Sequence, residues 1–429
     1  MKILLLTDEV WNDRIHGNNV LSNWFDGFPA EFAQIYCSPG LPRNNCCNQY
    51  FQITDKMMIN SILSKKRAGQ RITEMETASL KYESTDVGHI GFLRKNFGNL
   101  LRLLKNIVWV TGRYDTEELR TFIAEFSPDI IFTPRMATPK MLRLERIVNQ
   151  FANCPMVAFT GDNEYSLKMF SFSPIAWVNK FWVRKALRRN ANLYSLYYTL
   201  SDEQQAEYEK EFFFPVKVLR KCAEKPATEP CLTVNHPIRL VYAGKLYCNR
   251  WKTLAEIGNA IHIINANGQK IILDIYTKDV LDSKMKQSLD WKDSVVIHGA
   301  ISPEEVLQKY KECDVALHIE SFDMKYKYAT RLSFSTKIID CISGGCAVLV
   351  VAWDQHSGLT YLQREQAAIC ISNVKDILPT LTELCENEDQ ILVYKKNALA
   401  CALRNHSKEK IQRYLEKDFN DIIVKNNRR

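Results

Sequence analysis

The chain has 429 residues, of which 46% are hydrophobic and 25% are charged, and its formal net charge is +8. This length is too great for one ordinary hydrophobic core, so we expect two domains. No apolar run approaches the length of a membrane-spanning helix, so an integral membrane protein is not expected. The modest charge and the lack of a recognisable binding motif also argue against a nucleic-acid partner.

The N-terminal sequence MKILLLTDEV predicts a buried first strand, because its apolar run is too short for a signal peptide and ends at Asp8. We therefore expect a cytoplasmic protein. Thirteen cysteines are scattered from Cys37 to Cys401 without CxxC pairs, which indicates reduced thiols. Cys46 and Cys47 have no histidine or third cysteine at zinc-finger spacing, so we expect no structural metal.

Two segments of the first half hold the excess positive charge. Residues 91–113 contain five basic residues and no acidic one, and residues 168–189 combine basic residues with Trp177, Phe181 and Trp182. Helices of this kind lie in the headgroup layer of anionic membranes, or else bury their apolar face in a domain and leave lysines in water. Two such segments in one half favour a peripheral contact with the inner face of a membrane.

Short apolar runs alternate with helical patterns along the whole chain, which predicts parallel sheets covered by helices on both faces. The fold class is therefore α/β, with two doubly wound, Rossmann-like domains facing a cleft. We expect domains at residues 1–226 and 237–406, with a proline-rich linker between them and a helix at 407–424 that packs back on the first domain. The predicted strands are residues 2–6, 32–37, 129–133, 156–160, 238–244, 271–277, 294–299, 314–320 and 347–351.

Polar residues follow the predicted strands of the second half, where parallel sheets bind ligands. Basic side chains and helix N–H groups suit a diphosphate, and carboxylates accept hydrogen bonds from sugar or ribose hydroxyls. A nucleotide sugar carries both kinds of group. The residues are Lys245 and Arg250 after the first of these strands, Glu320 after the fourth, and Ser335, Thr336, Lys337 and Asp340 at the start of the next helix.

The stretch LSFSTKIIDCISGGCAVLVV, residues 332–351, predicts a loop, a helix, a turn and a strand. Ser335 and Thr336 are candidates for the helix N-cap, and Gly344 and Gly345 can end the helix. The helix N-terminus and Lys337 together suit a phosphate, although capping beside a solvated lysine explains the same residues.

These motifs resemble the donor-binding domain of GT-B glycosyltransferases, especially the large retaining family called family 4. The family pattern G-R-L-x-x-x-K corresponds to Gly244-Lys245-Leu246 followed by Arg250, with the two basic types exchanged. The family signature P-S-K-x-x-E-Y-x-A-x-G-x-P-V corresponds to STKIIDCISGGCAV, which starts at Ser335. The resemblance covers residues 238 to about 370 well and the first half mainly by layout.

The resemblance also implies roles for individual residues. Asp340 takes the place of the glutamate that contacts the nucleotide ribose. Glu320 stands near the place of the acidic residue that contacts the donor sugar and is expected to be catalytic, with a longer insertion before the helix than the family's spacing. On the acceptor side it implies a polar loop after the first strand, at His16, Asn18 and Asn19, and a catalytic group at Asp162. From the residues alone, Asp162 is as well explained as a turn former and His16 as a solvated loop histidine.

The sequence therefore predicts a transferase that moves a sugar from a nucleoside diphosphate sugar, the co-substrate, to a glycan or lipid-linked acceptor. No other cofactor is expected, nor a metal ion, because no Asp-x-Asp metal motif is evident. The resemblance implies retention of configuration. A nicotinamide dehydrogenase is disfavoured because no GxGxxG follows a predicted strand. A nucleotide-sugar epimerase and a non-catalytic nucleotide-binding partner subunit remain as alternatives.

Overall fold

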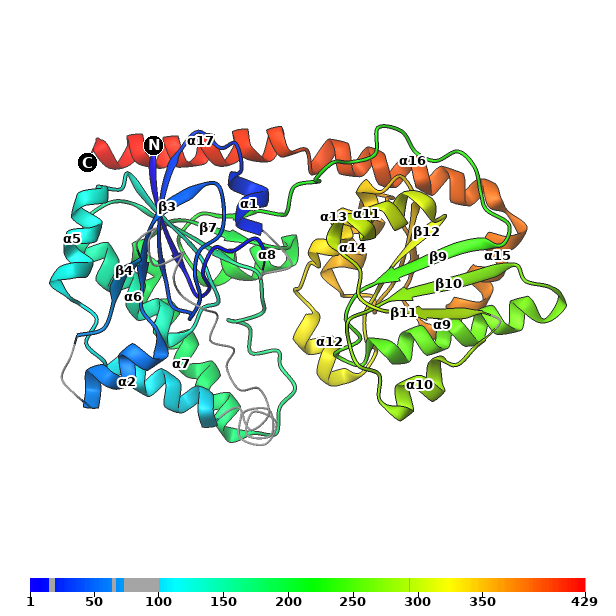
Figure 1. The fold of residues 1–429 in the computed structure, drawn as a ribbon, viewed down its shortest axis with the longest axis horizontal. Coiled ribbons are helices and arrows are strands. Elements are labelled where there is room, and N and C mark those ends of the chain that lie inside the picture. Colours follow the sequence, from blue (N-terminus) through cyan, green and yellow to red (C-terminus); the bar gives the residue numbers. More distant parts are fainter. Residues whose placement is uncertain (15–19, 64–66, 73–99, 293, 429) are drawn as a thin grey trace. The chain divides into compact units, whose positions relative to one another are not determined.

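The structure is a computed structural model, and it describes residues 1–14, 20–63, 67–72, 100–292 and 294–428. The chain divides into two compact units, residues 1–219 with 412–429 and residues 220–411. Each unit has one β-sheet flanked by helices, as Figure 1 shows. The predicted α/β class with two parallel-sheet domains is confirmed.

In the described part of the first unit, eight strands form a sheet in the order β4-β3-β2-β1-β5-β6-β7-β8. Every neighbouring pair is parallel except β3 with β4. The central strands are buried along almost their whole length, because helices cover both faces of the sheet. The strands are β1 (Lys2–Thr7), β2 (Glu31–Tyr36), β3 (Cys47–Gln52), β4 (Gln70–Ile72), β5 (Ile130–Pro134), β6 (Met156–Thr160), β7 (Tyr194–Thr199) and β8 (Val216–Val218).

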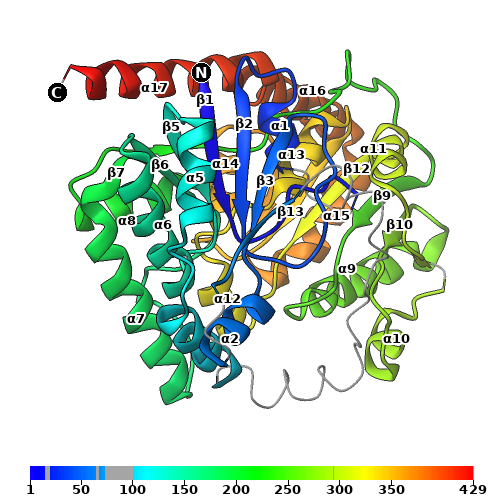
Figure 2. The same cartoon turned by 60° about the vertical axis from the view of Figure 1, so that its left-hand side comes forward.

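The helices of the first unit begin at capping residues that the sequence supplies. Thr116, Thr138 and Ser201 each accept a backbone N–H bond in the first turn of the helix that follows. Figure 2 shows α5 and α6 lying against the sheet. The helices are α1 (Val20–Phe25), α2 (Asp55–Leu63), residues 100–111, α5 (Glu117–Phe126), α6 (Pro139–Ala152), α7 (Pro174–Asn190) and α8 (Asp202–Glu211).

The second unit has a parallel sheet of six described strands in the order β11-β10-β9-β12-β13-β14. This is the doubly wound order 3-2-1-4-5-6, which reverses direction between β9 and β12. Ligands of such sheets bind beyond the carboxyl ends of the strands at that reversal. The strands are β9 (Ile238–Ala243), β10 (Ile271–Tyr276), β11 (Val295–His298), β12 (Val315–Ile319), β13 (Ala347–Val351) and β14 (Ile369–Ile371).

Apolar helix faces cover this second sheet around a core of leucine, isoleucine and valine side chains. Residues that alternate along β12, namely Val315, Leu317 and Ile319, belong to this core, and the intervening positions face the other side of the sheet. The helices are α9 (Arg250–Ile264), α10 (Ser283–Leu289), α11 (Pro303–Glu312), α12 (Met324–Thr330), α13 (Thr336–Ser343), α14 (Ser357–Arg364), α15 (Ile377–Glu386) and α16 (Glu388–Asn405).

All nine predicted strands are present, with ends that differ by at most one residue from the prediction. Five strands were not predicted, namely β3, β4, β7, β8 and β14. Three of these have only three residues, and β3 and β7 carry polar or tyrosine side chains that hide the apolar alternation. All thirteen cysteines are free thiols, as expected.

The last helix, α17 (Lys408–Asn427), packs against the first unit through its residues from Gln412 onward. Asp418 accepts hydrogen bonds from Tyr198 Oη and Lys217 Nζ, both at 2.6 Å, and Phe419 packs on Phe132. This helix was predicted at residues 407–424, and it ends three residues later, at Asn427.

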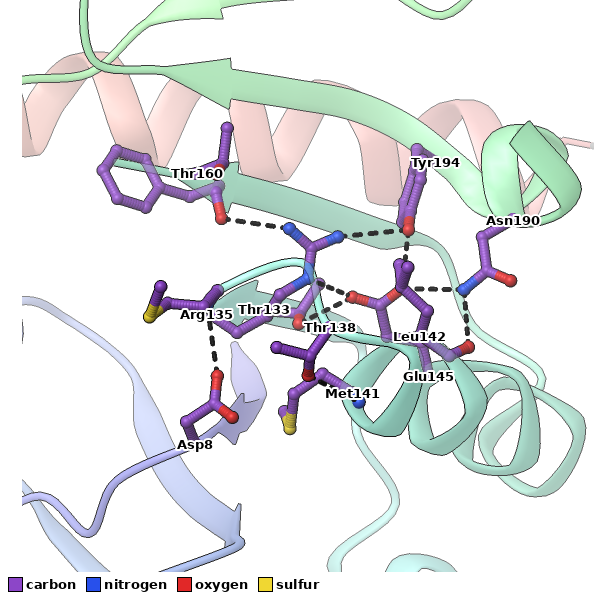
Figure 3. A network of polar contacts seen from close by, with 12 residues as sticks. Asp8, Thr133, Arg135, Thr138, Met141, Leu142, Glu145, Thr160, Asn190 and Tyr194 are labelled. Atoms are coloured by element: carbon purple, nitrogen blue, oxygen red, sulfur yellow. Dashed lines mark hydrogen bonds and ion pairs between the residues drawn. The ribbon is translucent and has the colours of Figure 1, made fainter. Parts of the chain in front are cut away.

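A buried ion pair braces the first sheet at the carboxyl end of β5. Arg135 Nε donates to Glu145 Oε1 at 2.7 Å, and neither side chain is exposed to solvent. Thr133, Tyr194 and Asn190 complete the hydrogen bonding of the Glu145 carboxylate, as Figure 3 shows. The network joins β5, α6, α7 and β7, so it fixes the elements behind the loops at this edge.

We predict that Glu145→Leu lowers the free energy of unfolding by about 3–5 kcal/mol, because it leaves the Arg135 guanidinium buried without its counter-ion. Urea unfolding of the full chain, followed by tryptophan fluorescence, measures the change. Glu125→Leu is the control, since it removes an exposed ion pair with Arg71 and should change stability far less. Equal effects of the two substitutions would contradict the role of the buried network.

Candidate active site

The carboxyl ends of β9 and β12 bring several predicted residues together in the second unit. The two strands pair through Leu240 with Val315, so Gly244 after β9 and Glu320 after β12 lie at the same edge of the sheet. This is the reversal point of the strand order. The sequence prediction of a polar site in this region therefore has a structural basis.

Arg250 and Glu320 form a bidentate ion pair at this edge. Arg250 is the first residue of α9, and its Nη2 and Nε donate to the two carboxylate oxygens of Glu320 at 2.6 and 3.1 Å. Burial alone lowers the pKa of Arg250, but the charge of Glu320 outweighs it and raises the pKa above its ordinary value. Thr253 Oγ1 also donates to the Glu320 backbone carbonyl at 2.8 Å. Both side chains are therefore fixed.

Lys337 lies in the first turn of α13 with its ammonium against Gly244. A β-carbon at position 244 would collide with Lys337 Nζ, so any larger residue there would force the end of the lysine side chain to move. Burial, followed by repulsion from Arg250, lowers the pKa of Lys337 to about 8. Within the described residues, no hydrogen bond or ion pair joins the Lys337 ammonium to an anionic group. An anion at this point would supply the missing partner.

The other residues that were predicted to bind the donor differ in their contacts. Ser335 occupies the N-cap position of α13, as predicted for it or Thr336, but its side chain makes no capping hydrogen bond. Lys221 Nζ lies 2.8 Å from Asp340 Oδ1 and fixes that carboxylate. The Tyr247 ring has Lys245 Nζ 5.8 Å and the Arg250 guanidinium 4.7 Å from its centroid.

Two histidines that the sequence analysis did not select complete the edge. His318 lies on β12 and is 5% exposed, and its Nε2 makes no hydrogen bond within the described residues. Burial, followed by the positive fields of His356, Arg250 and Lys337, holds the pKa of His318 well below its ordinary value. It is therefore neutral at pH 7. The sequence signal that could have revealed His318 is a histidine two residues before Glu320, inside the otherwise apolar run of residues 315–319.

His318, Glu320 and His356 have ligand atoms within 4.8 Å of one another, which raises the question of a metal ion. The donor set does not fit one. Both Glu320 oxygens accept bonds from Arg250, and His356 Nδ1 accepts the backbone N–H of Gly358 at 3.2 Å. A neutral His356 whose Nδ1 accepts this bond carries its proton on Nε2. Nε2 therefore cannot bind a metal ion unless it loses that proton.

In the first unit, Asp162 lies on an exposed loop after β6. Gln204 Nε2 donates to the Asp162 carbonyl at 2.8 Å, and Lys180 Nζ donates to the carbonyls of Asn163 and Glu164. Protein atoms around the Asp162 carboxylate raise its pKa by desolvation. Burial raises the pKa of Glu164, which the sequence analysis did not select, to about 7. The loop thus holds two carboxylates with raised pKa values.

The other predicted acceptor-side residues cannot be placed. His16, Asn18 and Asn19 lie outside the described residues. Of the two basic segments, residues 91–99 also lie outside them, whereas residues 100–113 and 168–189 are described.

Comparison with solved structures identifies the fold. The chain matches sucrose-phosphate synthase from Thermosynechococcus elongatus with a TM-score of 0.63, over 99% of this chain and 100% of that chain, at 12% sequence identity. It matches HepE from Anabaena, in complex with UDP, with a TM-score of 0.60 over 98% and 100% of the two chains, at 13% identity. An Escherichia coli trehalose-6-phosphate protein bound with UDP-2-fluoro glucose matches with a TM-score of 0.58 over 98% and 99%, at 8% identity.

These solved structures are GT-B glycosyltransferases, and at such low identities the likeness concerns the fold. No family model matches the sequence, and no curated protein does. The two parallel-sheet units of this chain thus have the GT-B fold.

We predict that the Lys337 amine reacts with acetic anhydride with a midpoint near pH 8, because only the deprotonated amine is a nucleophile. An ordinary lysine has its midpoint at about 10.4. Competitive labelling of the native protein beside N-acetyl-lysine, quantified by peptide mass spectrometry, measures both. A midpoint for Lys337 equal to that of the standard would contradict its placement beside Arg250.

Proposed function

We propose that the protein is a glycosyltransferase that moves a sugar from a nucleoside diphosphate sugar to a glycan or lipid-linked acceptor, in cell-surface polysaccharide assembly. One observation carries the proposal. The Lys337 ammonium lies against Gly244 at the reversal point of a GT-B sheet, without an anionic partner among the described residues. A diphosphate bound there supplies the negative charge that this position lacks.

The donor-side residues then have distinct tasks. Lys337, Lys245 and Arg250 hold the diphosphate, with Gly244 leaving room beside it and the N–H groups at Ser335 and Thr336 facing its oxygens. Asp340 accepts hydrogen bonds from the ribose through Oδ2, since Lys221 occupies Oδ1. Glu320 faces the sugar.

The chemical step separates the sugar from the diphosphate, and negative charge grows on the leaving oxygens. Lys337 and the start of α13 stabilise that charge in place of a metal ion. Removing one such preorganised group typically costs about 10²–10³ in rate. Retention of configuration follows from the family 4 resemblance. On the acceptor side, Asp162 is the proposed catalytic group, held by the braced loop after β6.

The solved relatives support a nucleotide-sugar substrate by what they bind. HepE from Anabaena has been crystallised with UDP and with UDP and glucose, and the E. coli relative with UDP-2-fluoro glucose. Two other functions would use the same site. An epimerase would release an altered donor or free sugar, and a non-catalytic partner subunit would bind nucleotide without turnover. Analysis of the products separates the three.

We predict that Lys337→Ala lowers transfer at least about 100-fold, because the leaving diphosphate loses its unpaired cation. Nucleotide release from a panel of nucleoside diphosphate sugars, with membrane extract as the acceptor source, measures it. Lys252→Ala is the matched control, because Lys252 pairs with Asp323 on the surface of the same unit. The rate should be the same in EDTA. Near-normal turnover by the Lys337 variant would refute the proposed function.

A membrane surface is the second part of the proposal. Among helices of the described residues, none is long and apolar enough to cross a bilayer. The first unit nevertheless exposes large apolar side chains on α2, on helical residues 100–111 and on α7 with the segment before it. They are Ile59, Ile62 and Leu63, then Leu100, Leu101, Leu104, Ile107 and Val110, then Leu167, Phe170, Phe172, Val178 and Phe181.

Contacts place the first two of these elements side by side. Trp109 Nε1 donates to Asp55 Oδ1 of α2 at 2.6 Å, and Lys105 pairs with Asp55 at 2.7 Å. The helix of residues 100–111 buries Trp109 and still leaves apolar residues in water, and the exposed Arg102 and the exposed Lys56 of α2 suit anionic headgroups. This favours the membrane interpretation of the two basic segments over simple burial.

We predict that Phe172→Ser with Phe181→Ser weakens binding to phosphatidylglycerol vesicles about tenfold, because two apolar anchors are lost. Vesicle co-sedimentation measures it. Phe213→Ser is the control, since Phe213 is fully exposed on the same unit but lies away from these helices in the sequence. Failure of the unmodified protein to bind the vesicles, or an equal loss in the control, would contradict a membrane surface here.

A further inference from the structure

His318 is a buried polar side chain whose hydrogen bonding is incomplete. It lies near the end of β12 on the face opposite the core formed by Leu317 and Ile319, and it is 5% exposed. Its Nε2 has no hydrogen-bond partner in the described part of the chain. A buried donor or acceptor without a partner destabilises a fold, because it gives up its hydrogen bonds to water without replacement. An apolar residue would fill this strand position without that penalty.

The surroundings of His318 indicate what could complete its bonding. Its Nε2 lies 3.9 Å from Glu320 Oε1, too far for a direct hydrogen bond. A single oxygen atom about 2.8 Å from each would bridge them once the surrounding side chains move to admit it, since Nε2 is closed to solvent here. That oxygen would accept the Nε2–H of His318 and donate its own proton to the carboxylate, and a hydroxyl group does both.

A cation is a poor alternative at this point. Arg250 and Lys337 already place positive charge near His318, which opposes a further cation there. An anion is a poor alternative as well, since it would lie against the Glu320 carboxylate. A neutral group that both donates and accepts remains, and sugar hydroxyls are such groups.

The positions of His318 and Glu320 agree with the order of groups in a nucleotide sugar, in which the sugar is bonded directly to the diphosphate. Glu320 is joined to Arg250, and Arg250 acts on Lys337 closely enough to lower its pKa. The hydroxyl-binding pair is therefore next to the proposed diphosphate position, as a sugar is next to the phosphate to which it is bonded.

We propose that His318 and Glu320 together bind one hydroxyl of the donor sugar, so that His318 helps to determine which sugar the enzyme accepts. This inference rests on the proposed function. It gives His318 a positioning and selecting role for a neutral, hydroxyl-bearing sugar, separate from the binding of the nucleotide.

The test compares UDP with UDP-glucose as ligands of the full chain, by isothermal titration. His318→Leu should leave the affinity for UDP within about twofold and weaken UDP-glucose about tenfold, the loss expected for one hydrogen bond. His318→Gln should restore part of the loss, because its amide N–H lies near the place of Nε2. UDP-deoxyfluoroglucoses replace one sugar hydroxyl by fluorine. One of these analogues should bind the unmodified protein as weakly as UDP-glucose binds His318→Leu. The same analogue should bind His318→Leu with no further loss of affinity.

Several results would overturn the inference. They are an equal loss of UDP and UDP-glucose in His318→Leu, no loss of either, or an equimolar metal ion in the unmodified protein that disappears in the variant. Circular dichroism shows whether the variant is folded, and the glutamine variant serves if it is not. If the unmodified protein binds neither ligand, or Lys337→Ala binds both normally, the proposed function fails for uridine donors and this inference fails with it.

Discussion

The carboxyl edge of the second unit depends on a half-buried ammonium group, that of Lys337, which makes no hydrogen bond or ion pair with a carboxylate in the described part of the chain. The close approach of Lys337 to Gly244 is possible because residue 244 has no side chain, and Arg250 adds a second positive field. The Glu320 carboxylate is already committed to Arg250. The protein therefore maintains an unfavourable concentration of positive charge, which a bound anion relieves. Such preorganisation spares the site from rearranging when charge develops.

The carboxyl edge of the second sheet was predictable because parallel strands fix where chain segments meet. Gly244, Arg250, Glu320 and Lys337 are separated by up to 93 positions in sequence, yet each follows a strand or begins a helix at the same edge. The apolar runs of these strands are long enough to predict the strands without a structure. Strands such as β7 were not predicted, because five of its six residues carry hydroxyl groups and its buried tyrosines do not form an apolar pattern in the sequence.

The pairings within the site could not be predicted. Sequence chemistry assigned Arg250 and Glu320 separately to ligand groups, and nothing in their spacing indicates that they bind each other. His318 and Glu164 were missed for a related reason, since their importance lies in burial and in unfilled hydrogen bonds, which are properties of the folded chain. Ser335 shows a further limit of residue type. Its type correctly predicts the N-cap position of α13, but the hydrogen bond that usually accompanies it is not formed.

The path of α17 has a consequence for how the protein folds during synthesis. Leu415 and Phe419 are fully buried in the first unit, and Asp418 joins Tyr198 and Lys217 there. The second unit, by contrast, is one continuous stretch that ends at Ile411. We therefore expect the first unit to be completed after the second, because the apolar surface that binds α17 stays exposed until residues 412–427 have been synthesised.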